Sequence, residues 1–158
     1  MSNFINENQW LAGLIAGFLL NQIAVSLDRY RKRKDVKISF EKHILFIKGS
    51  LNYISRDLEN IPHTTMMAED YKRTYAQNIE NLRNEIITID KESIPNALKE
   101  EVASLANDLT FFANLVKNNK EGEAMLKSDD TIRFAEEIAI KQRLNVEKIF
   151  KYLNIKFD

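Results

Sequence analysis

Few side chains in this sequence are of the types that carry chemistry, and their spacing does not assemble them. The 158 residues include two histidines and no cysteine. Carboxylate-bridged metal sites in helical bundles need inward-facing glutamates and Glu-x-x-His pairs. Here Pro62, a helix breaker, separates Glu59 from His63, while Glu41 and His43 are two positions apart and face differently on a helix. The sequence therefore predicts no metal site and no cofactor.

Motifs for catalysis are missing as well. The sequence contains no G-x-x-x-x-G-K-[ST] phosphate loop, no G-x-S-x-G nucleophile motif and no H-E-x-x-H motif. Without cysteine, thiol nucleophiles, disulfides and thiolate metal sites are excluded. No base stands at a recognisable spacing from a Ser or Thr hydroxyl. We therefore predict that the chain is not an enzyme.

Aromatic and basic residues group on two segments, where they suit a small-nucleotide ligand. Aromatic rings stack on bases, and Lys or Arg side chains hold phosphates. The candidate ligand-binding residues are Tyr71, Arg73, Tyr75, Arg133, Lys141 and Arg143. The alternative is that the two tyrosines belong to a helix core and the cations to a solvated helix face. Both interpretations stay open at this point.

The elements that would position these residues are helices. Apolar residues recur every three or four positions in four segments beyond residue 37, and period-two alternation is nearly absent. The predicted core positions are Phe40, Ile44, Ile47, Leu51, Ile54, Leu58 and Ile61; Met67, Tyr71, Tyr75, Ile79, Leu82, Ile86 and Ile89; Leu98, Val102, Leu105, Leu109, Phe112 and Val116; and Ile132, Ala135, Ala139, Gln142, Val146, Ile149 and Leu153. The first set has the spacing of a coiled-coil seam. An all-α antiparallel bundle of about four helices is the simplest fold for this pattern.

The first 37 residues differ from this body. Trp10–Leu27 carries no charge, and the next seven residues, DRYRKRK, contain five Lys or Arg. An uncharged stretch of this length is typical of a transmembrane helix, and Trp10 and Tyr30 stand where interfacial aromatic residues are favoured. We predict a transmembrane helix over 10–27, between a short external N-terminus (1–9) and a basic juxtamembrane linker (28–37). Residues 38–158 would then form a cytoplasmic bundle.

Two alternatives compete for this stretch. A cleaved signal peptide would need a basic region before the apolar run, but residues 1–9 contain Glu7 and no Lys or Arg. A buried helix of a soluble domain stays open, because Asn21 and Gln22 interrupt the apolar run. Basic residues follow the stretch and none precede it. A single-pass protein would therefore have its N-terminus outside and its C-terminal domain in the cytoplasm, at the inner membrane if the source is bacterial.

The predicted span and its basic flank each suggest a partner. Small residues four apart let two helices approach, and a buried Asn hydrogen-bonds across the contact, so Gly13, Gly17, Asn21 and Ala24 predict a homo-oligomer. The alternative is that Gly and Ala are simply common in spans. The residues expected to bind anionic lipid headgroups are Arg29, Arg31, Lys32, Arg33 and Lys34. Residues 38–158 hold 17 basic and 20 acidic side chains, which disfavours duplex nucleic acid as a partner.

Together these patterns favour a membrane-anchored, non-enzymatic sensor or effector. Its bundle would bind a protein or a small nucleotide, and its span would self-associate or perturb the membrane. In architecture alone, the layout is similar to that of small bacterial membrane effectors in stress response or phage defence. The segment DRYRKRKDVK contains neither Gly nor Pro, so the first bundle helix is expected to continue from the span as one rod, with Gly49 as a point of weakness or bending. The alternatives are a passive anchor or scaffold for a cytoplasmic partner, and an immunity-type inhibitor of another membrane protein.

Overall fold

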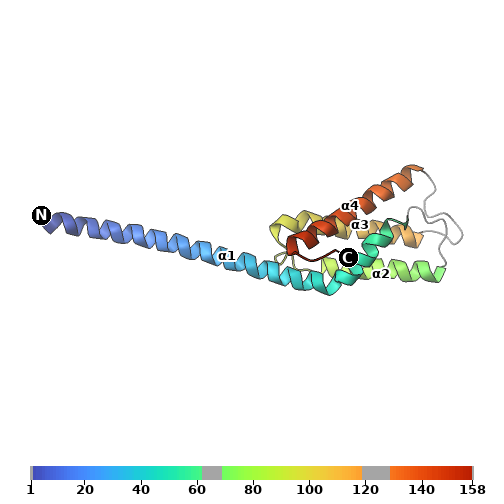
Figure 1. The fold of residues 1–158 in the computed structure, drawn as a ribbon, viewed down its shortest axis with the longest axis horizontal. Coiled ribbons are helices and arrows are strands. Elements are labelled where there is room, and N and C mark those ends of the chain that lie inside the picture. Colours follow the sequence, from blue (N-terminus) through green and yellow to red (C-terminus); the bar gives the residue numbers. More distant parts are fainter. Residues whose placement is uncertain (1, 62–68, 119–128, 158) are drawn as a thin grey trace.

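The computed structural model describes residues 2–61, 69–118 and 129–157, except for the side chains of residues 2–9, 12, 69, 118 and 129. In these ranges the chain forms four α-helices, the short 3-10 helix η2 and no strand, so the all-α prediction is confirmed (Figure 1). The elements are α1 (Ser2–Leu58), α2 (Glu69–Ile87), η2 (Asn96–Leu98), α3 (Lys99–Asn118) and α4 (Asp129–Leu153).

The helices form an antiparallel bundle. Figure 1 shows α1 and α3 running in one direction and α2 and α4 in the other. Helix α2 packs against α3, α3 against α4, and α1 against both α4 and α2. This closed ring of neighbours is the arrangement of an up-and-down four-helix bundle, which confirms the predicted bundle.

The core of the bundle follows the predicted periodicity closely. All seven seam positions of α1 and its following turn are buried, as are all six predicted positions of α3 and its preceding turn. In α4, Ile132 is half-buried and the other six positions are buried. In the second segment the last five positions are buried, but Tyr71 is half exposed, and Met67 lies outside the described residues. Burial of each large apolar side chain contributes about 1.5–3 kcal/mol to folding, which is why the periodicity decides the fold.

Helix α1 has two parts with different surroundings. From Phe40 to Leu58 it lies in the bundle, whereas every described side chain from Trp10 to Asp35 is exposed. Figure 1 shows this first part as a long blue rod that projects from the bundle. The helix is unbroken through residues 28–37, as expected for a segment without Gly or Pro. The rod and the first bundle helix are therefore one element.

The exposure of this rod bears on the alternatives for residues 10–27. The bundle leaves each of the described large apolar side chains in this range between 38% and 67% exposed, so this helix is not a core element of the bundle. Among the described residues, no helix combines the length and the apolar character needed to cross a membrane. Ala12, within the predicted span, and the side chains of the predicted external N-terminus lie outside the described residues. The span stays a prediction.

The part of α1 inside the bundle is bent relative to the rod. In Figure 1 the turquoise-to-green end of α1 turns away from the straight blue part. Gly49 and Ser50 form a Gly-Ser pair in this region of the sequence, and such pairs are a common cause of helix kinks. A Cβ atom added at Gly49 would meet nothing within 4 Å, so packing does not require glycine here. The backbone freedom of Gly49 accounts for the bend that the sequence suggested.

Helix α4 ends in a way that returns the chain to the bundle. Asn154 adopts a left-handed conformation with φ of 57°, and the Ile155 N–H donates to the Phe150 carbonyl at 2.8 Å. This is the pattern of a Schellman cap, in which Asn replaces the usual Gly. The Phe157 ring then lies 5.7 Å from the Phe150 ring, between centroids. The cap therefore fixes the backbone of the last turn of α4, which includes Tyr152.

Candidate functional site

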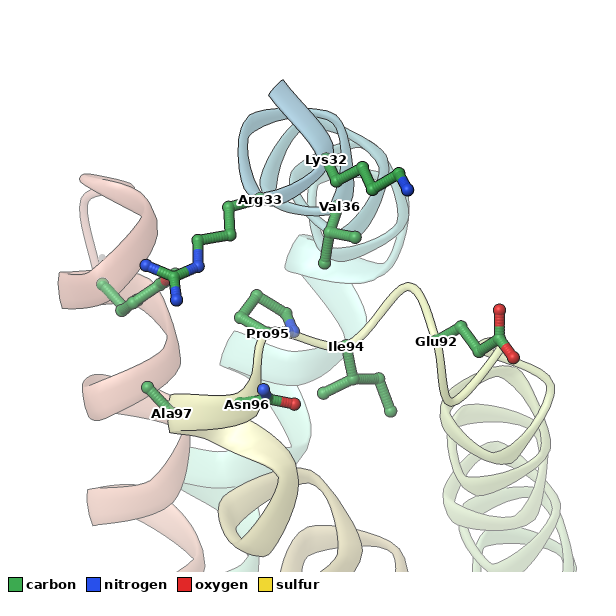
Figure 2. A pocket seen from close by; sticks show the side chains of 9 residues that line it. Lys32, Arg33, Val36, Glu92, Ile94, Pro95, Asn96 and Ala97 are labelled. Carbon is green, nitrogen blue, oxygen red and sulfur yellow. The ribbon is translucent and has the colours of Figure 1, made fainter. Parts of the chain in front are cut away.

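A cavity of about 390 Å³ lies where the rod of α1 joins the bundle. Three elements line it: α1, the connection from α2 through η2, and the last turn of α4. Its residues are Lys32, Arg33, Val36, Glu92, Ile94, Pro95, Asn96, Ala97 and Tyr152 (Figure 2). We call it the joint cavity. Its volume falls within the range of small-ligand pockets, about 300–1,000 Å³.

The floor of the joint cavity is apolar, and local hydrogen bonds fix the backbone that forms it. Figure 2 shows Val36 pointing from α1 toward Ile94 and Pro95, both of which are buried. The connection is shaped by an Asp90 turn, in which the Asp90 carboxylate accepts from the Glu92 N–H at 3.1 Å. Such turns are a common use of Asp, because its short side chain reaches the backbone two residues on. Pro95 then restricts φ, and its carbonyl accepts from the Leu98 N–H at 2.8 Å to begin η2.

The charges around the joint cavity are distributed unequally. Figure 2 shows Lys32 and Arg33 leaving α1 in opposite directions, with Glu92 on the side of Lys32. The Lys32 ammonium also lies 3.0 Å from the Asp28 carboxylate, an exposed pair that holds the two side chains only weakly. Arg33 makes no ion pair or hydrogen bond with the described residues. The Arg33 side of the cavity therefore has a cation without a carboxylate among its lining residues.

A second cation stands beside this side of the joint cavity. The Lys37 ammonium lies 5.1 Å from the centroid of the Tyr152 ring, within the range of a cation–π contact. Because Lys37 follows Arg33 by four residues, both lie on the helix face that looks toward α4. On this side, Arg33 of the lining and Lys37 beside it form a cationic wall next to the apolar floor. That combination suits an anion carrying apolar carbon, and no pair of groups in it resembles a nucleophile with its base.

The five predicted lipid-binding residues all lie in the rod and are all exposed. Of these, Lys32 and Arg33 line the joint cavity, whereas Arg29, Arg31 and Lys34 do not. The predicted oligomerisation residues Gly13, Gly17, Asn21 and Ala24 are exposed on the same rod. A Cβ atom at either glycine would meet nothing within 4 Å, so this face is open. Self-association through it stays a prediction.

The six predicted ligand-binding residues are dispersed over the bundle. On α2, Tyr71 and Arg73 are exposed, whereas Tyr75 is buried. The Tyr71 and Tyr75 rings stack with 5.8 Å between centroids. Burial raises the pKa of the Tyr75 hydroxyl well above its usual range. Tyr75 thus has the surroundings that the core alternative described, and Tyr71 does not.

The three predicted cations of α4 contact carboxylates on three different elements. Arg133 pairs with Asp130 of α4 at 3.1 Å, and Lys141 lies 3.7 Å from Asp108 of α3. Arg143 pairs with Glu59, after α1, at 2.8 Å. None of the three lines the joint cavity. They do not form one cluster, and nucleotide binding through them stays a prediction.

Polar side chains also occur in the bundle core, between α1 and α4. The buried Gln142 donates through Nε2 to the Ser55 hydroxyl at 3.1 Å. Three further polar atoms of these two helices have no hydrogen-bond partner among the described residues: Asn52 Oδ1, Gln142 Oε1 and Asn145 Nδ2. A buried polar pair of this kind favours one helix register over others, because a slipped register leaves both partners unsatisfied.

No protein-family model, no curated protein and no solved structure matches this chain. The functional argument therefore rests on the chain's own geometry. The sequence pointed to Lys32 and Arg33 through the basic cluster but gave no signal for Asn96, Ala97 or Tyr152. These three have ordinary helix-start and helix-end surroundings in sequence, and only the folded bundle brings them to α1.

Proposed function

We propose that this chain is a single-pass, non-enzymatic membrane protein of the sensor or effector type. Residues 10–27 of α1 would cross the bilayer and the bundle would lie in the cytoplasm. The observation that carries the proposal is the rod: one helix runs unbroken from an uncharged, uncovered apolar segment into the core of a folded bundle. A bilayer and a folded domain would then share a single rigid element.

The exposed apolar surface of the rod supports the membrane location. Nine side chains of this segment favour insertion by a few tenths of a kcal/mol each, about 3–5 kcal/mol in sum. They are Leu11, Leu14, Ile15, Phe18, Leu19, Leu20, Ile23, Val25 and Leu27, and the bundle leaves all of them exposed. These exposed apolar side chains favour an apolar environment, which a bilayer would supply without a further protein. The basic residues after Leu27 favour the cytoplasm for the bundle.

The continuity of α1 supports a signalling role over passive anchoring. A ligand or protein that shifts the packing of α1 in the bundle would also move or rotate the span, because no flexible linker absorbs the change. Small residues form an open face on the rod, which supports self-association of several spans in the membrane. They are Gly13, Gly17, Asn21 and Ala24.

Two matched substitutions test the membrane location. Phe18 lies in the rod and is 60% exposed, and Phe46 lies on the bundle part of α1 and is 80% exposed. We expect the full chain to stay in the membrane pellet after alkaline carbonate extraction. Phe18→Arg should release it, because an Arg near the centre of a span costs about 2.5–3.5 kcal/mol. Phe46→Arg should leave it in the pellet. Extraction of the unmodified chain as a soluble oligomer would instead mean that copies of the rod cover one another in water.

A second measurement tests the effector role. Induced expression in bacteria should slow growth and lower the membrane potential, and the combined variant Gly13→Leu, Gly17→Leu, Asn21→Leu should do neither while remaining in the membrane. The three leucines keep the segment apolar and remove only the small-residue face. Harmless expression of the unmodified chain under all inducing conditions would favour the scaffold instead.

A further inference from the structure

We infer that the joint cavity binds the phosphate of one anionic phospholipid headgroup, with Arg33 as its main contact. The inference deepens the proposed function and rests on it, since a membrane lipid lies beside the cavity in the cell only if residues 10–27 cross the bilayer. It differs from a diffuse attraction of the basic cluster to the membrane surface, because it assigns one cation, one cavity and one ligand.

The position of the joint cavity along α1 matches the depth of the headgroups. Arg33 follows Leu27 by six residues, or about 9 Å of helix. The headgroup layer on each side of a bilayer is about 5–7 Å thick. Side chains on a helix lean toward its N-terminus, and a long Arg side chain snorkels, so the guanidinium of Arg33 would reach that layer when residues 10–27 lie in the bilayer. The lining residues from η2 and α4 lie at the end of the bundle from which the rod projects (Figure 1), and this end would face the membrane if residues 10–27 cross it.

The charges of the joint cavity select the Arg33 side for an anion. On the other side, the Lys32 ammonium lies 3.0 Å from the Asp28 carboxylate, and Glu92 stands on the same side of the cavity, so carboxylates already supply negative charge there. Arg33 makes no such contact within the described residues, and Lys37 adds a second cation on the same helix face. A phosphodiester has two free oxygens that share one negative charge, and a guanidinium can bind both at once.

The apolar floor distinguishes a phospholipid from a free phosphate. Val36, Ile94 and Pro95 lie directly under the cationic wall (Figure 2). The glycerol carbons and the first methylenes of an acyl chain would cover this floor, whereas inorganic phosphate would leave its apolar side chains exposed to water. A lipid held there would contact α1, the α2–α3 connection and α4 together, and would brace the joint between span and bundle.

Thermal unfolding of the full chain in detergent micelles tests the inference. A ligand that binds only the folded state stabilises it by RT ln(1 + [L]/Kd), so the rise of the melting temperature with ligand concentration gives an apparent affinity. The probes are phosphatidylglycerol, phosphatidylcholine and inorganic phosphate. We expect stabilisation by phosphatidylglycerol alone. Equal stabilisation by inorganic phosphate would overturn the assignment to a lipid.

The matched control is Arg31, which belongs to the same exposed basic cluster but does not line the joint cavity. We expect Arg33→Gln to weaken phosphatidylglycerol binding by at least about tenfold, the loss typical of a charge-assisted bidentate contact. Arg31→Gln should weaken it by about fivefold at most, the effect of one basic residue near a charged surface. Equal losses in the two variants would mean diffuse attraction and would overturn the inference.

A second pair of variants tests the opposite wall. Ala97 lines the joint cavity and lies below the guanidinium of Arg33 in Figure 2, and Ala103 is exposed on α3 outside the cavity. Ala97→Glu should abolish the stabilisation by phosphatidylglycerol, because the new carboxylate would form an ion pair with Arg33 in place of the lipid phosphate. Ala103→Glu should leave it unchanged, and both variants should melt normally without lipid because both positions are exposed. A chain that stays in the membrane while Ala97→Glu binds lipid normally would refute the cavity but not the span.

Discussion

At the scale of single residues, the buried carboxylate of Asp108 shows how the bundle accommodates charge. Asp108 is 7% exposed, accepts from the Ser104 hydroxyl at 3.3 Å and lies 3.7 Å from the Lys141 ammonium. Burial raises the pKa of its carboxyl, and Lys141 and Ser104 oppose that shift without cancelling it. Ionised Asp108 therefore costs folding free energy, despite its ion pair.

This imbalance predicts a pH-dependent effect of Asp108→Asn. Because the folded state has the higher pKa, it binds the proton more readily, and the wild type loses stability as pH rises through this pKa. We expect Asp108→Asn to be more stable than the wild type at pH 7 in urea unfolding. The difference should shrink as pH falls and vanish below the pKa of an unfolded Asp, about 3.9. Lys141→Met should lower the free energy of unfolding at pH 7, because it removes the cation that partly offsets the buried charge of Asp108. A constant difference from pH 7 to pH 3.5 would contradict the assignment.

Glu101 provides the contrast on the same helix. Its carboxylate accepts from the Lys148 ammonium of α4, and this hydrogen bond lowers the pKa of Glu101. The folded state therefore holds Glu101 ionised more strongly than the unfolded state does, and this pair contributes stability that is lost as pH falls through the lowered pKa. Two acidic residues of α3 thus shift in opposite directions because one gains more from its partner than burial costs it, and the other gains less.

At the scale of elements, the bend in α1 is the feature most open to a direct test. Glycine within a helix costs about 0.5–1 kcal/mol relative to alanine, and a Cβ at Gly49 would meet no atom within 4 Å. We expect Gly49→Ala to raise the free energy of unfolding by that amount in thermal denaturation. Gly13→Ala, in the rod, should leave the unfolding of the bundle unchanged. A loss of stability in Gly49→Ala would mean that the bend needs a backbone geometry that alanine disfavours.

The elements themselves were largely predictable from the sequence, for a physical reason. The seam from Phe40 to Ile61 and the pattern from Leu98 to Val116 alternate at helix spacing, and burying those side chains dominates the folding free energy. Tyr71 departs from its pattern because it lies in the first turn of α2, where the helix reaches the end of the core. The joint cavity was not predictable, since Arg33 and Tyr152 are brought together only by the antiparallel path of the chain. Likewise, the Ser55–Gln142 hydrogen bond joins two residues that are 87 positions apart in the sequence.

At the scale of the whole molecule, one helix joins the exposed rod to the folded bundle. The bundle has a core of its own, and α1 contributes one of its four walls. The rod has no partner within the described chain and depends on whatever surrounds residues 10–27. Residues 28–37 therefore carry every mechanical effect that passes between the two, because they are the only covalent route between them. The joint cavity is lined by residues of this segment, so a ligand bound there would contact both the rod and the bundle.

The last prediction concerns this segment as a mechanical link. Asp35 is exposed and has no part in the cavity lining. Asp35→Pro removes a helix hydrogen bond and disrupts the preceding turn at a cost of about 3 kcal/mol, whereas Asp35→Ala keeps the helix. In bilayer nanodiscs, we expect the amides of residues 28–38 to exchange slowly in the wild type and in Asp35→Ala. In Asp35→Pro they should exchange rapidly while the bundle core stays protected, and the growth effect of expression should be lost. Rapid exchange across residues 28–38 in the wild type would show a flexible tether, and a span so attached could not respond to the bundle as one body.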